Sequence, residues 1–419
     1  GDDDIWFMQG GVWTNNTGHT STYTGNVLYG WTESGWDSSY GGDTTAWSTL
    51  YPGMECFNTV APTGPGKVKF NDPVDPDFST TTNGKFDWIG LINNQANWDS
   101  YANNALYVAN GYNYIGGCTL VNLATSVYVN GKWSGRVDKN WFNCLNWETL
   151  IVPVATTDVI IPTAVNDAEI DAAAPFAVYS NYIAKTKNLT ITGQKVTIKD
   201  NLANKLEVHG DLTIANTVAD GALNMNGGTA TDGQLYLYGN WNNNKNNDAF
   251  DEGKGKVHFM GALPQVINNV TPIGTEMFND VILNNDFNTA VSNDLLLKGD
   301  LTLNIGKTLT IDSNGYATVY NKLTSNGTVM IQNNGQLIQV NDSDTNTGDY
   351  TSTTTRFQVL RNYTARDIDY VYWSAPTKLM APSSLPTGNR YEWDPVYPNT
   401  NGTFGNWRVP TTPTMTEGR

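Results

Sequence analysis

Short runs of alternating apolar and polar residues follow one another along most of the chain, and Gly, Asn and Asp separate them. Alternation with a period of two puts every second side chain on the same face of a strand, whereas an amphipathic helix repeats its apolar residues every three or four positions. Apolar residues at helical spacing do not persist beyond about two turns anywhere in the chain. The pattern therefore predicts an all-β fold.

The first 130 residues differ from the rest of the chain in composition and in the regularity of the pattern. Ten of the 14 tryptophans lie before residue 148, and irregular, Gly-rich loops separate the alternating runs. The pattern predicts a β-sandwich-like domain over residues 1–130, built from antiparallel sheets. Its expected strands include residues 27–31, 66–70, 86–91, 105–108 and 126–129.

From residue 188 onward a short unit recurs. LEVHGDLTI at 206–214 is echoed by LLLKGDLTL at 295–303 and, more briefly, by LYLYGNW at 235–241. NLTITGQKVTI at 188–198 resembles DLTLNIGKTLTI at 300–311 in the same way. Each unit places a Gly-Asp or similar corner between two apolar-x-apolar strands. Gly, Asn and Asp accept the left-handed backbone geometry that a sharp corner favours.

Strands this short cannot be stable alone. Each buries about two side chains worth ~1.5–3 kcal/mol apiece, which is less than the cost of ordering its backbone. Stacked coils share one core, so the repeat predicts a β-solenoid (parallel β-helix-like) over residues 131–347; a row of β-sandwiches is the alternative. We expect stacked strands from about 160 to 345, with a set of apolar residues facing inward: Leu206, Val208, Leu212, Leu295, Leu297 and Leu301. Residues 348–419 are expected to form a β-rich segment of a longer protein.

The net charge indicates which classes of binding partner are disfavoured. With 24 basic and 40 acidic residues the formal net charge is −16, which disfavours nucleic acid and anionic membranes as partners. No apolar run reaches the ~18 residues of a membrane helix, so we expect no direct membrane insertion. The opening Gly-Asp-Asp-Asp is interpreted as the start of an excised or processed segment.

Cysteine and histidine are scarce. The three cysteines, Cys56, Cys118 and Cys144, and the three histidines are far apart in sequence, so we expect no catalytic metal and no organic cofactor. One disulfide with a free thiol and a set of buried reduced thiols stay open as alternatives.

Two stretches resemble a known group of proteins. The first contains GKWSG at 131–135, Trp141, Asn146-Trp147, Val152-Pro153 and DVIIP at 158–162; the second contains NTG at 346–348 and YVYWSAP at 370–376. Together they resemble large secreted surface proteins of Bacteroidota that the type IX secretion system exports. The resemblance covers residues 131–419 and implies an adhesin-like protein at the cell surface, attached to the outer membrane, in a group of which some members serve gliding motility.

One candidate ligand site lies in the first 130 residues. Aromatic rings, carboxylates and glycines, a combination that sugar-binding surfaces use, occur together at Trp31, Trp36, Asp37, Tyr40 and Asp43. The alternative is that the tryptophans fill the core of the sandwich. Loops on a rigid β scaffold are where binding usually resides, so we expect recognition here rather than on the solenoid.

One candidate cation site follows the repeats. Asp342, Asp344, Asn346 and Asp349 carry oxygen ligands at a spacing similar to that of calcium loops. An EF-hand would have Gly one residue before Gly348 and Glu where Thr353 stands, so a solvated polar turn is the alternative. Calcium is the single cofactor that the sequence leaves open.

Enzymatic chemistry finds little support. Strand positions of the expected solenoid carry mostly Thr, Leu, Val and Ile, and Glu207 and Asp280 are isolated. We expect uniform solenoid faces covered by Thr and Asn. No repeated carboxylate position suggests a glycosidase pair, and Gly-x-Ser-x-Gly is absent. We therefore expect a non-enzymatic adhesin or stalk segment whose partners are surface glycans or other surface proteins, besides components of type IX secretion and outer-membrane attachment. The alternatives are a carbohydrate-binding module on a solenoid scaffold and a polysaccharide-active β-helix enzyme.

Overall fold

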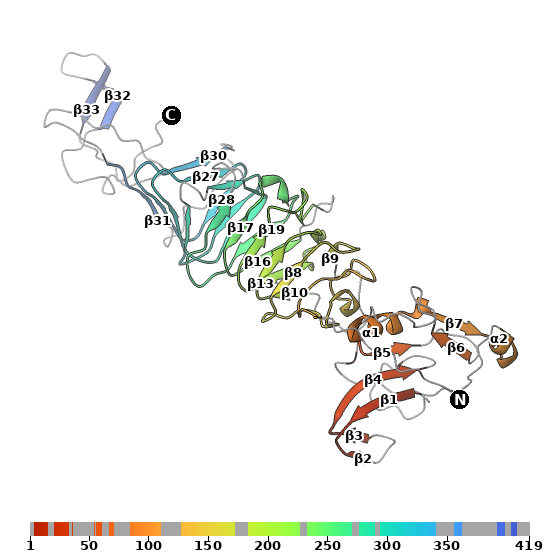
Figure 1. Cartoon of the computed structure of the whole chain (residues 1–419). Helices are drawn as coiled ribbons and strands as arrows, with labels where there is room; N and C mark the ends of the chain where they lie inside the picture. Colours follow the sequence, from red (N-terminus) through yellow and green to blue (C-terminus); the bar gives the residue numbers. More distant parts are fainter. Residues whose placement is uncertain are drawn as a thin grey trace.

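The computed structural model describes residues 4–15, 21–32, 36, 54, 56–60, 67–70, 84–109, 127–171, 183–226, 233–269, 276–289, 294–340, 356–362, 392–398 and 404–408. Short strands dominate these residues, and most of them pair in parallel along an elongated stack that Figure 1 shows in yellow to blue. The all-β class and the solenoid predicted from the repeats are confirmed.

The solenoid has three sides, because successive strands join three stacks of sheets in turn. The first side is one seven-stranded sheet: β10 (Ile183–Thr186), β13 (Lys205–Val208), β16 (Gln234–Leu237), β19 (Lys256–Phe259), β22 (Asp280–Leu283), β25 (Leu301–Leu303) and β28 (Leu323–Ser325).

The second side consists of two sheets, which a bridge between Gln265 and Phe287 connects. Its strands are β8 (Val159–Ile161), β11 (Leu189–Ile191), β14 (Leu212–Ile214), β17 (Trp241–Asn243), β20 (Ile267–Asn269), β23 (Phe287–Thr289), β26 (Thr308–Ile311), β29 (Thr328–Ile331) and β31 (Arg356–Val359).

The third side likewise has an earlier and a later sheet. The earlier contains β9 (Ala168–Ile170), β12 (Val196–Ile198), β15 (Leu223–Asn224) and β18 (Phe250–Asp251). The later contains β21 (Met277–Phe278), β24 (Leu295–Leu297), β27 (Tyr316–Val319) and β30 (Gln336–Gln339).

Inward-facing side chains form ladders along the solenoid. In the first sheet Leu206 lies in register with Leu235, and Leu235 with Val257, and all three are almost fully buried. The six inward-facing residues predicted from the repeats are buried as well, which confirms the orientation of these strands. Each coil thus shares its core with its neighbours, as the energy of short strands requires.

The two echoed sequences occupy different corners of the solenoid. LEVHGDLTI runs through β13 and β14, from the first side to the second, whereas LLLKGDLTL runs through β24 and β25, from the third side to the first. The echo therefore marks a recurring bend between two short strands, and the bend moves by one corner between the earlier and the later coils.

The glycine of this bend is required for a different reason from the one expected. Gly210 and Gly299 do not have left-handed backbone geometry. A Cβ atom at Gly210 would instead overlap the amide oxygen of Asn188, and one at Gly299 would overlap a carboxylate oxygen of Asp280. Close approach of the preceding coil excludes a side chain at these corners.

The N-terminal strands form small sheets. The order of the largest is β1 (Asp4–Gln9), β4 (Asn26–Thr32) and β5 (Asn58–Val60), while β2 (Trp13–Asn15) pairs with β3 (Ser21–Tyr23) and β6 (Lys67–Phe70) pairs with β7 (Trp98–Tyr101). The strands expected at 27–31 and 66–70 are thus confirmed by β4 and β6. Their assembly into a sandwich stays a prediction, as do the domain boundaries at 130 and 347.

Three expected strands are wrong. Residues 86–91 lie in α1 (Lys85–Asn93), residues 105–108 lie in α2 (Asn104–Ala109), and the described residues 127–129 form no strand. Asp87 caps α1, because its carboxylate accepts the backbone N–H of Gly84 at 3.1 Å. Burial of Trp88 fixes the helix against its surroundings, so local capping and tertiary packing override a strand-like composition.

The remaining described elements are small. Three 3-10 turns occur at Gln95–Asn97, Cys144–Asn146 and Asn247–Ala249, and a hairpin near the C-terminus joins β32 (Glu392–Pro398) to β33 (Phe404–Arg408). Neither described helix is long and apolar enough to cross a membrane.

Candidate functional site

Trp133 of GKWSG, Trp147 of the NW motif and Trp141 between them form a cap on the solenoid. Trp133, Trp141 and Trp147 are at most 1% exposed, and the Trp147 ring lies 5.0 Å from that of Trp133 and 4.8 Å from that of Trp141, edge to face in both cases. Lys132 bridges to Ile160 of β8, so this cluster covers the first coil. The motif has a structural role here, because the rings shield the end of the core from water.

Asn146 of the same motif holds the cap loop together. Its side-chain oxygen accepts the backbone N–H groups of Val137 and Asp138 at 3.0 and 3.1 Å, and its amide donates to the carboxylate of Asp138 and to the carbonyl of Asn140. All hydrogen-bonding groups of this fully buried side chain are therefore used within the loop.

A disulfide and an ion pair attach the N-terminal residues to the cap. Cys56 and Cys144 are bonded, with 5.9 Å between their Cα atoms. The guanidinium of Arg136 lies 3.6 Å from the Asp87 carboxylate and donates to the carbonyl of Phe86. Of the two alternatives for cysteine, the structure has the disulfide; Cys118 lies outside the described residues.

The predicted aromatic site is only partly described, and its two tryptophans lie apart. In the backbone register, Trp31 of β4 pairs with Ile5 of β1. The ring of Trp36 lies 4.6 Å from that of Trp6, and both rings cover the face of the sheet toward which a Cβ atom at Gly30 would point. Because neighbouring residues of a strand point to opposite faces, Trp31 and Trp36 lie on opposite faces of the sheet. Asp37, Tyr40 and Asp43 lie outside the described residues, and so do the candidate calcium ligands Asp342, Asp344, Asn346 and Asp349.

The structure brings a second group of residues together on the outside of the first side. Register pairing puts Lys185, Glu207, Tyr236 and His258 in one outward row on four successive coils. Lys205, Gln234 and Lys256 form a parallel row, and His209 and Tyr238 follow directly after β13 and β16. We name this group the lysine–tyrosine surface: Lys185, Lys205, Glu207, His209, Tyr236, Tyr238, Lys256 and His258.

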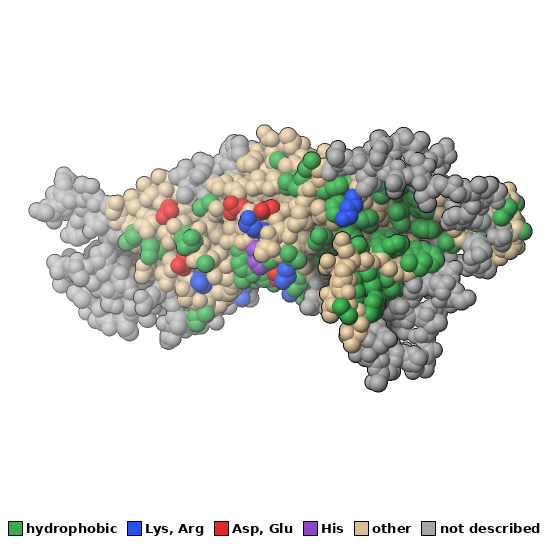
Figure 2. Space-filling model, turned by 60° about the horizontal axis from the view of Figure 1, so that its bottom comes forward, with side chains coloured by type: hydrophobic (Ala, Val, Ile, Leu, Met, Phe, Trp, Pro, Cys, Tyr) green, Lys and Arg blue, Asp and Glu red, His purple; other side chains and the backbone are tan. Residues whose placement is uncertain are grey.

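Contacts within the lysine–tyrosine surface link neighbouring coils. A carboxylate oxygen of Glu207 lies 3.3 Å from the Lys185 ammonium and 3.3 Å from Nε2 of His209. His209 stacks on Tyr238 with 4.8 Å between ring centroids and 4° between planes. Tyr236 stacks in the same way on His258, at 4.2 Å and 12°. Figure 2 shows histidine, lysine and acidic side chains gathered on this part of the solenoid.

Burial and neighbouring charges set the protonation of these groups. Burial, followed by the Glu207 charge, raises the pKa of Tyr236 and of Tyr238, so both hydroxyls stay protonated. Burial, with Lys256 and Lys205 nearby, lowers the pKa of His258 to about 4, so its imidazole is neutral at neutral pH. The surface therefore presents ammonium, phenol and imidazole groups around one carboxylate, which suits hydrogen bonding to an oxygen-rich ligand.

Sequence reasoning missed this surface. It treated Glu207 as isolated and the solenoid faces as uniform, and both interpretations are wrong for these coils. The partners lie far apart in sequence and meet only through coil stacking. The one signal in the sequence is the Gly-Asp corner, because aligning the coils by their corners places these residues on neighbouring coils. Later coils do match the expectation, since Thr302 and Thr324 occupy the corresponding row on β25 and β28.

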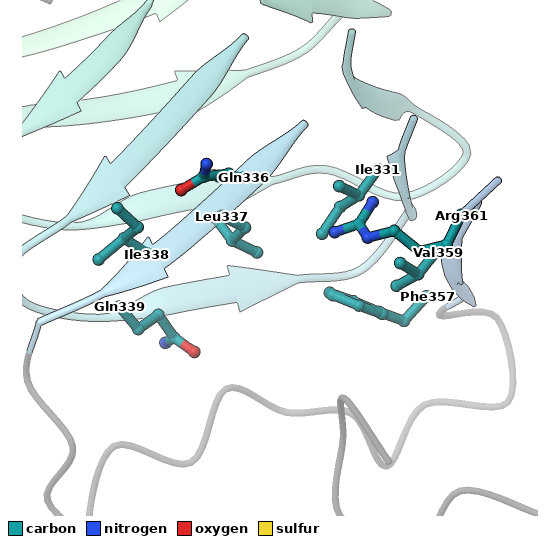
Figure 3. A pocket seen from close by; sticks show the side chains of 8 residues that line it. All are labelled: Ile331, Gln336, Leu337, Ile338, Gln339, Phe357, Val359 and Arg361. Carbon is teal, nitrogen blue, oxygen red and sulfur yellow. The ribbon is translucent and has the colours of Figure 1, made fainter. Parts of the chain in front are cut away.

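The far end of the solenoid contains a cavity of about 450 Å³. Figure 3 shows Leu337, Phe357 and Val359 directed toward it, in positions that continue the inward ladders of the second and third sides. All three are half-buried, whereas Ile331 on the preceding coil is 5% exposed. The cavity is the end of the core, and the Arg361 guanidinium beside it donates to the carbonyls of Gln332 and Gly335.

Within the described residues no group of three or more His, Cys, Asp or Glu side chains is arranged to hold a metal ion. A family model described as a domain of unknown function (DUF8693) matches residues 265–419. No curated protein and no solved structure matches the chain. The family match covers the later coils and the residues after them, and it begins beyond the lysine–tyrosine surface.

Proposed function

We propose that this chain is a non-enzymatic stalk segment of a cell-surface adhesin. The observation that carries the proposal is the continuous solenoid, capped by tryptophans at one end and disulfide-linked there to the N-terminal strands. Each added coil lengthens such a rod by about 4.8 Å without changing its cross-section. A rod of this kind holds a recognition region away from the surface that bears it.

The N-terminal strands supply a surface for contact. Ile5, Phe7, Val12 and Trp13 are 47%, 56%, 67% and 53% exposed, and Figure 2 shows hydrophobic side chains gathered toward this end of the molecule. Exposed apolar patches of this kind mark interaction sites in many proteins. In the proposal, this region contacts surface proteins or glycans.

Export by a type IX-like route and attachment to the outer membrane complete the proposal. They rest on the resemblance of residues 131–419 to secreted surface proteins of Bacteroidota. The disulfide between Cys56 and Cys144 is in keeping with an oxidising, extracellular location. A part in surface attachment or gliding motility follows from the same resemblance.

The test is an adhesion assay with beads coated with the whole chain, on polysaccharide-coated glass and on bacterial lawns. We expect the Phe7→Ser/Trp13→Ser variant to lose attachment. The matched control is Ile305→Ser, which removes a 69% exposed apolar side chain from a solenoid turn and should leave attachment unchanged. If both variants attach as well as the wild type, the adhesin role is contradicted. If the chain releases reducing ends from the polysaccharide, the absence of catalysis is contradicted.

A carbohydrate-binding module on a solenoid scaffold is the second candidate. The lysine–tyrosine surface favours it, because donor groups recur there from coil to coil beside the carboxylate of Glu207. Titration of the purified chain with a panel of oligosaccharides tests this function, and the absence of binding to every member refutes it.

A further inference from the structure

We propose that the lysine–tyrosine surface binds an acidic polysaccharide, whose chain lies along the solenoid axis and whose carboxylates meet Lys205 and Lys185. The inference rests on the second proposed function, carbohydrate binding, and assigns it a place and a ligand class. Neither the family match nor the sequence motifs point to these residues.

Charge is the first argument. The chain as a whole carries −16, yet Lys185, Lys205 and Lys256 lie on β10, β13 and β19 of one side. Lys185 pairs with Glu207 and Lys256 with Asp280. The Lys205 ammonium lies 5.9 Å from the centre of the Tyr236 ring and pairs with no carboxylate among the described residues. Such an ammonium is available to a carboxylate of a ligand at little cost in lost protein contacts.

Repetition is the second argument. Donor groups recur from β10 to β19 at the coil spacing of about 4.8 Å. A linear polymer that crosses these strands meets a new set of donors at every coil, and several weak contacts then add up in one chain. A compact ligand would contact only one or two coils of this row.

The orientation of the rings is the third argument. Stacking of His209 on Tyr238 and of Tyr236 on His258, with planes within 12° of parallel, covers one face of each ring. The rings belong to neighbouring coils, so their planes lie across the axis. His209 is exposed and Tyr238 is half-buried, whereas Nε2 of His258 is buried. Neutral sugars bind aromatic residues mainly through ring faces, whereas edges with hydroxyl and imidazole groups suit hydrogen bonding to carboxylates.

The experiment is calorimetric titration of the whole chain with oligomers of alginate or polygalacturonate at low and at high salt. We expect binding that weakens as salt rises, because exposed ammonium–carboxylate contacts are screened. A neutral cello-oligosaccharide of equal length should bind at least about ten-fold more weakly, because it lacks the charged groups.

Variants locate the site. Lys205→Gln and Lys185→Gln should each weaken uronate binding about ten-fold, and Tyr238→Phe, which keeps the ring stack and removes one donor, should weaken it several-fold. Lys199→Gln is the matched control: its ammonium pairs with Glu169 and Asp171 on the third side, and its loss should leave binding unchanged. Thermal unfolding of each variant confirms that it is folded.

Four results would overturn the inference. Neutral and acidic oligomers bound equally well, with no effect of the lysine variants, would keep carbohydrate binding and remove this site. Equal weakening by Lys199→Gln would mean that bulk charge is responsible. Single-stranded DNA bound as tightly as alginate would mean an unselective polyanion patch. Absence of binding to every oligosaccharide refutes the inference and the second proposed function together.

Discussion

A carboxylate oxygen of Asp211 accepts a hydrogen bond from the backbone N–H of Asn240, one coil further along the solenoid, at 2.7 Å. The same contact recurs on both sides of this pair. Asn188 accepts from the N–H of Asp211 at 2.8 Å, and Asn240 accepts from that of Val266 at 3.0 Å. The Asp or Asn of each corner thus anchors the backbone of the next coil, which is why these residues recur at the bends.

A second ladder of corner hydrogen bonds begins after Val266 and follows a different corner. Asp280 accepts from the N–H of Asp300 at 2.9 Å, and Asp300 accepts from that of Lys322 at 3.1 Å. This ladder runs along the corner between the third and first sides, whereas the first runs between the first and second sides. The change of corner coincides with the change in position of the echoed sequences.

The ladder predicts the effect of removing one of its members. Asn188→Ala should lower the free energy of unfolding by about 1–2 kcal/mol, because the N–H of Asp211 and the carboxylate of Asp158 both lose a partner. Urea denaturation measures the change. Asn268→Ala removes an exposed amide whose one hydrogen bond within the described residues is to the side chain of Asn242, and should cost much less. Similar losses in the two variants would contradict a special role for the corner.

The corner glycine gives a prediction about coupling. Gly210→Ala should destabilise the protein by about 1–3 kcal/mol, because its methyl group overlaps the side chain of Asn188. In an Asn188→Ala background the same change should cost less, by about 1 kcal/mol, since the obstructing amide is gone. The measurement is a double-mutant cycle on unfolding free energies; a cost that is equal in both backgrounds would assign the glycine to backbone geometry.

Glu276 predicts a pH dependence of stability. Its side chain is buried in the solenoid, where the indole N–H of Trp241 and the amide of Asn243 donate to it at 3.1 and 2.8 Å. Burial raises its pKa from 4.5 to about 7. Because the folded-state pKa lies above the unfolded one, the stabilising contribution is complete below about pH 4.5 and is lost as the pH rises through 7, by about 3 kcal/mol.

Glu276→Gln should therefore remove this loss, since the amide oxygen still accepts both hydrogen bonds and carries no charge. Melting temperatures at pH 5 and pH 8 provide the test, and the variant should exceed the wild type at pH 8. Asp220→Asn is the control, because that carboxylate is largely exposed and pairs with Lys245. A wild-type protein equally stable at both pH values would contradict the raised pKa.

The disulfide predicts a local effect of reduction. Cys56 and Cys144 are 88 residues apart, and in the chain-entropy model closing a loop of this size stabilises a protein by about 4–5 kcal/mol. Cys56→Ser/Cys144→Ser should therefore loosen the N-terminal strands while the solenoid stays folded. Limited proteolysis should cut the variant first within residues 1–130. Reductant should accelerate cleavage of the wild type and have no effect on the variant; a solenoid that unfolds on reduction would contradict the prediction.

The sequence by itself determined the all-β class, the short strands, their corners and the inward side of residues such as Leu206 and Leu295. These features depend on neighbours within a few positions, where a period of two and a Gly-Asp bend can be recognised. It did not determine the helix at Lys85–Asn93, because a cap at Gly84 and the burial of Trp88 outweigh composition there.

Only the tertiary structure decided which residues meet across coils. Hydrogen-bonded corner residues are separated by 20 residues at Asp280 and Asp300 but by 29 at Asp211 and Asn240, so no fixed period aligns the coils. Stacking follows the common core rather than the count of residues, and loops of unequal length absorb the difference. For that physical reason Glu207 is isolated in the sequence and lies beside Lys185 in the fold.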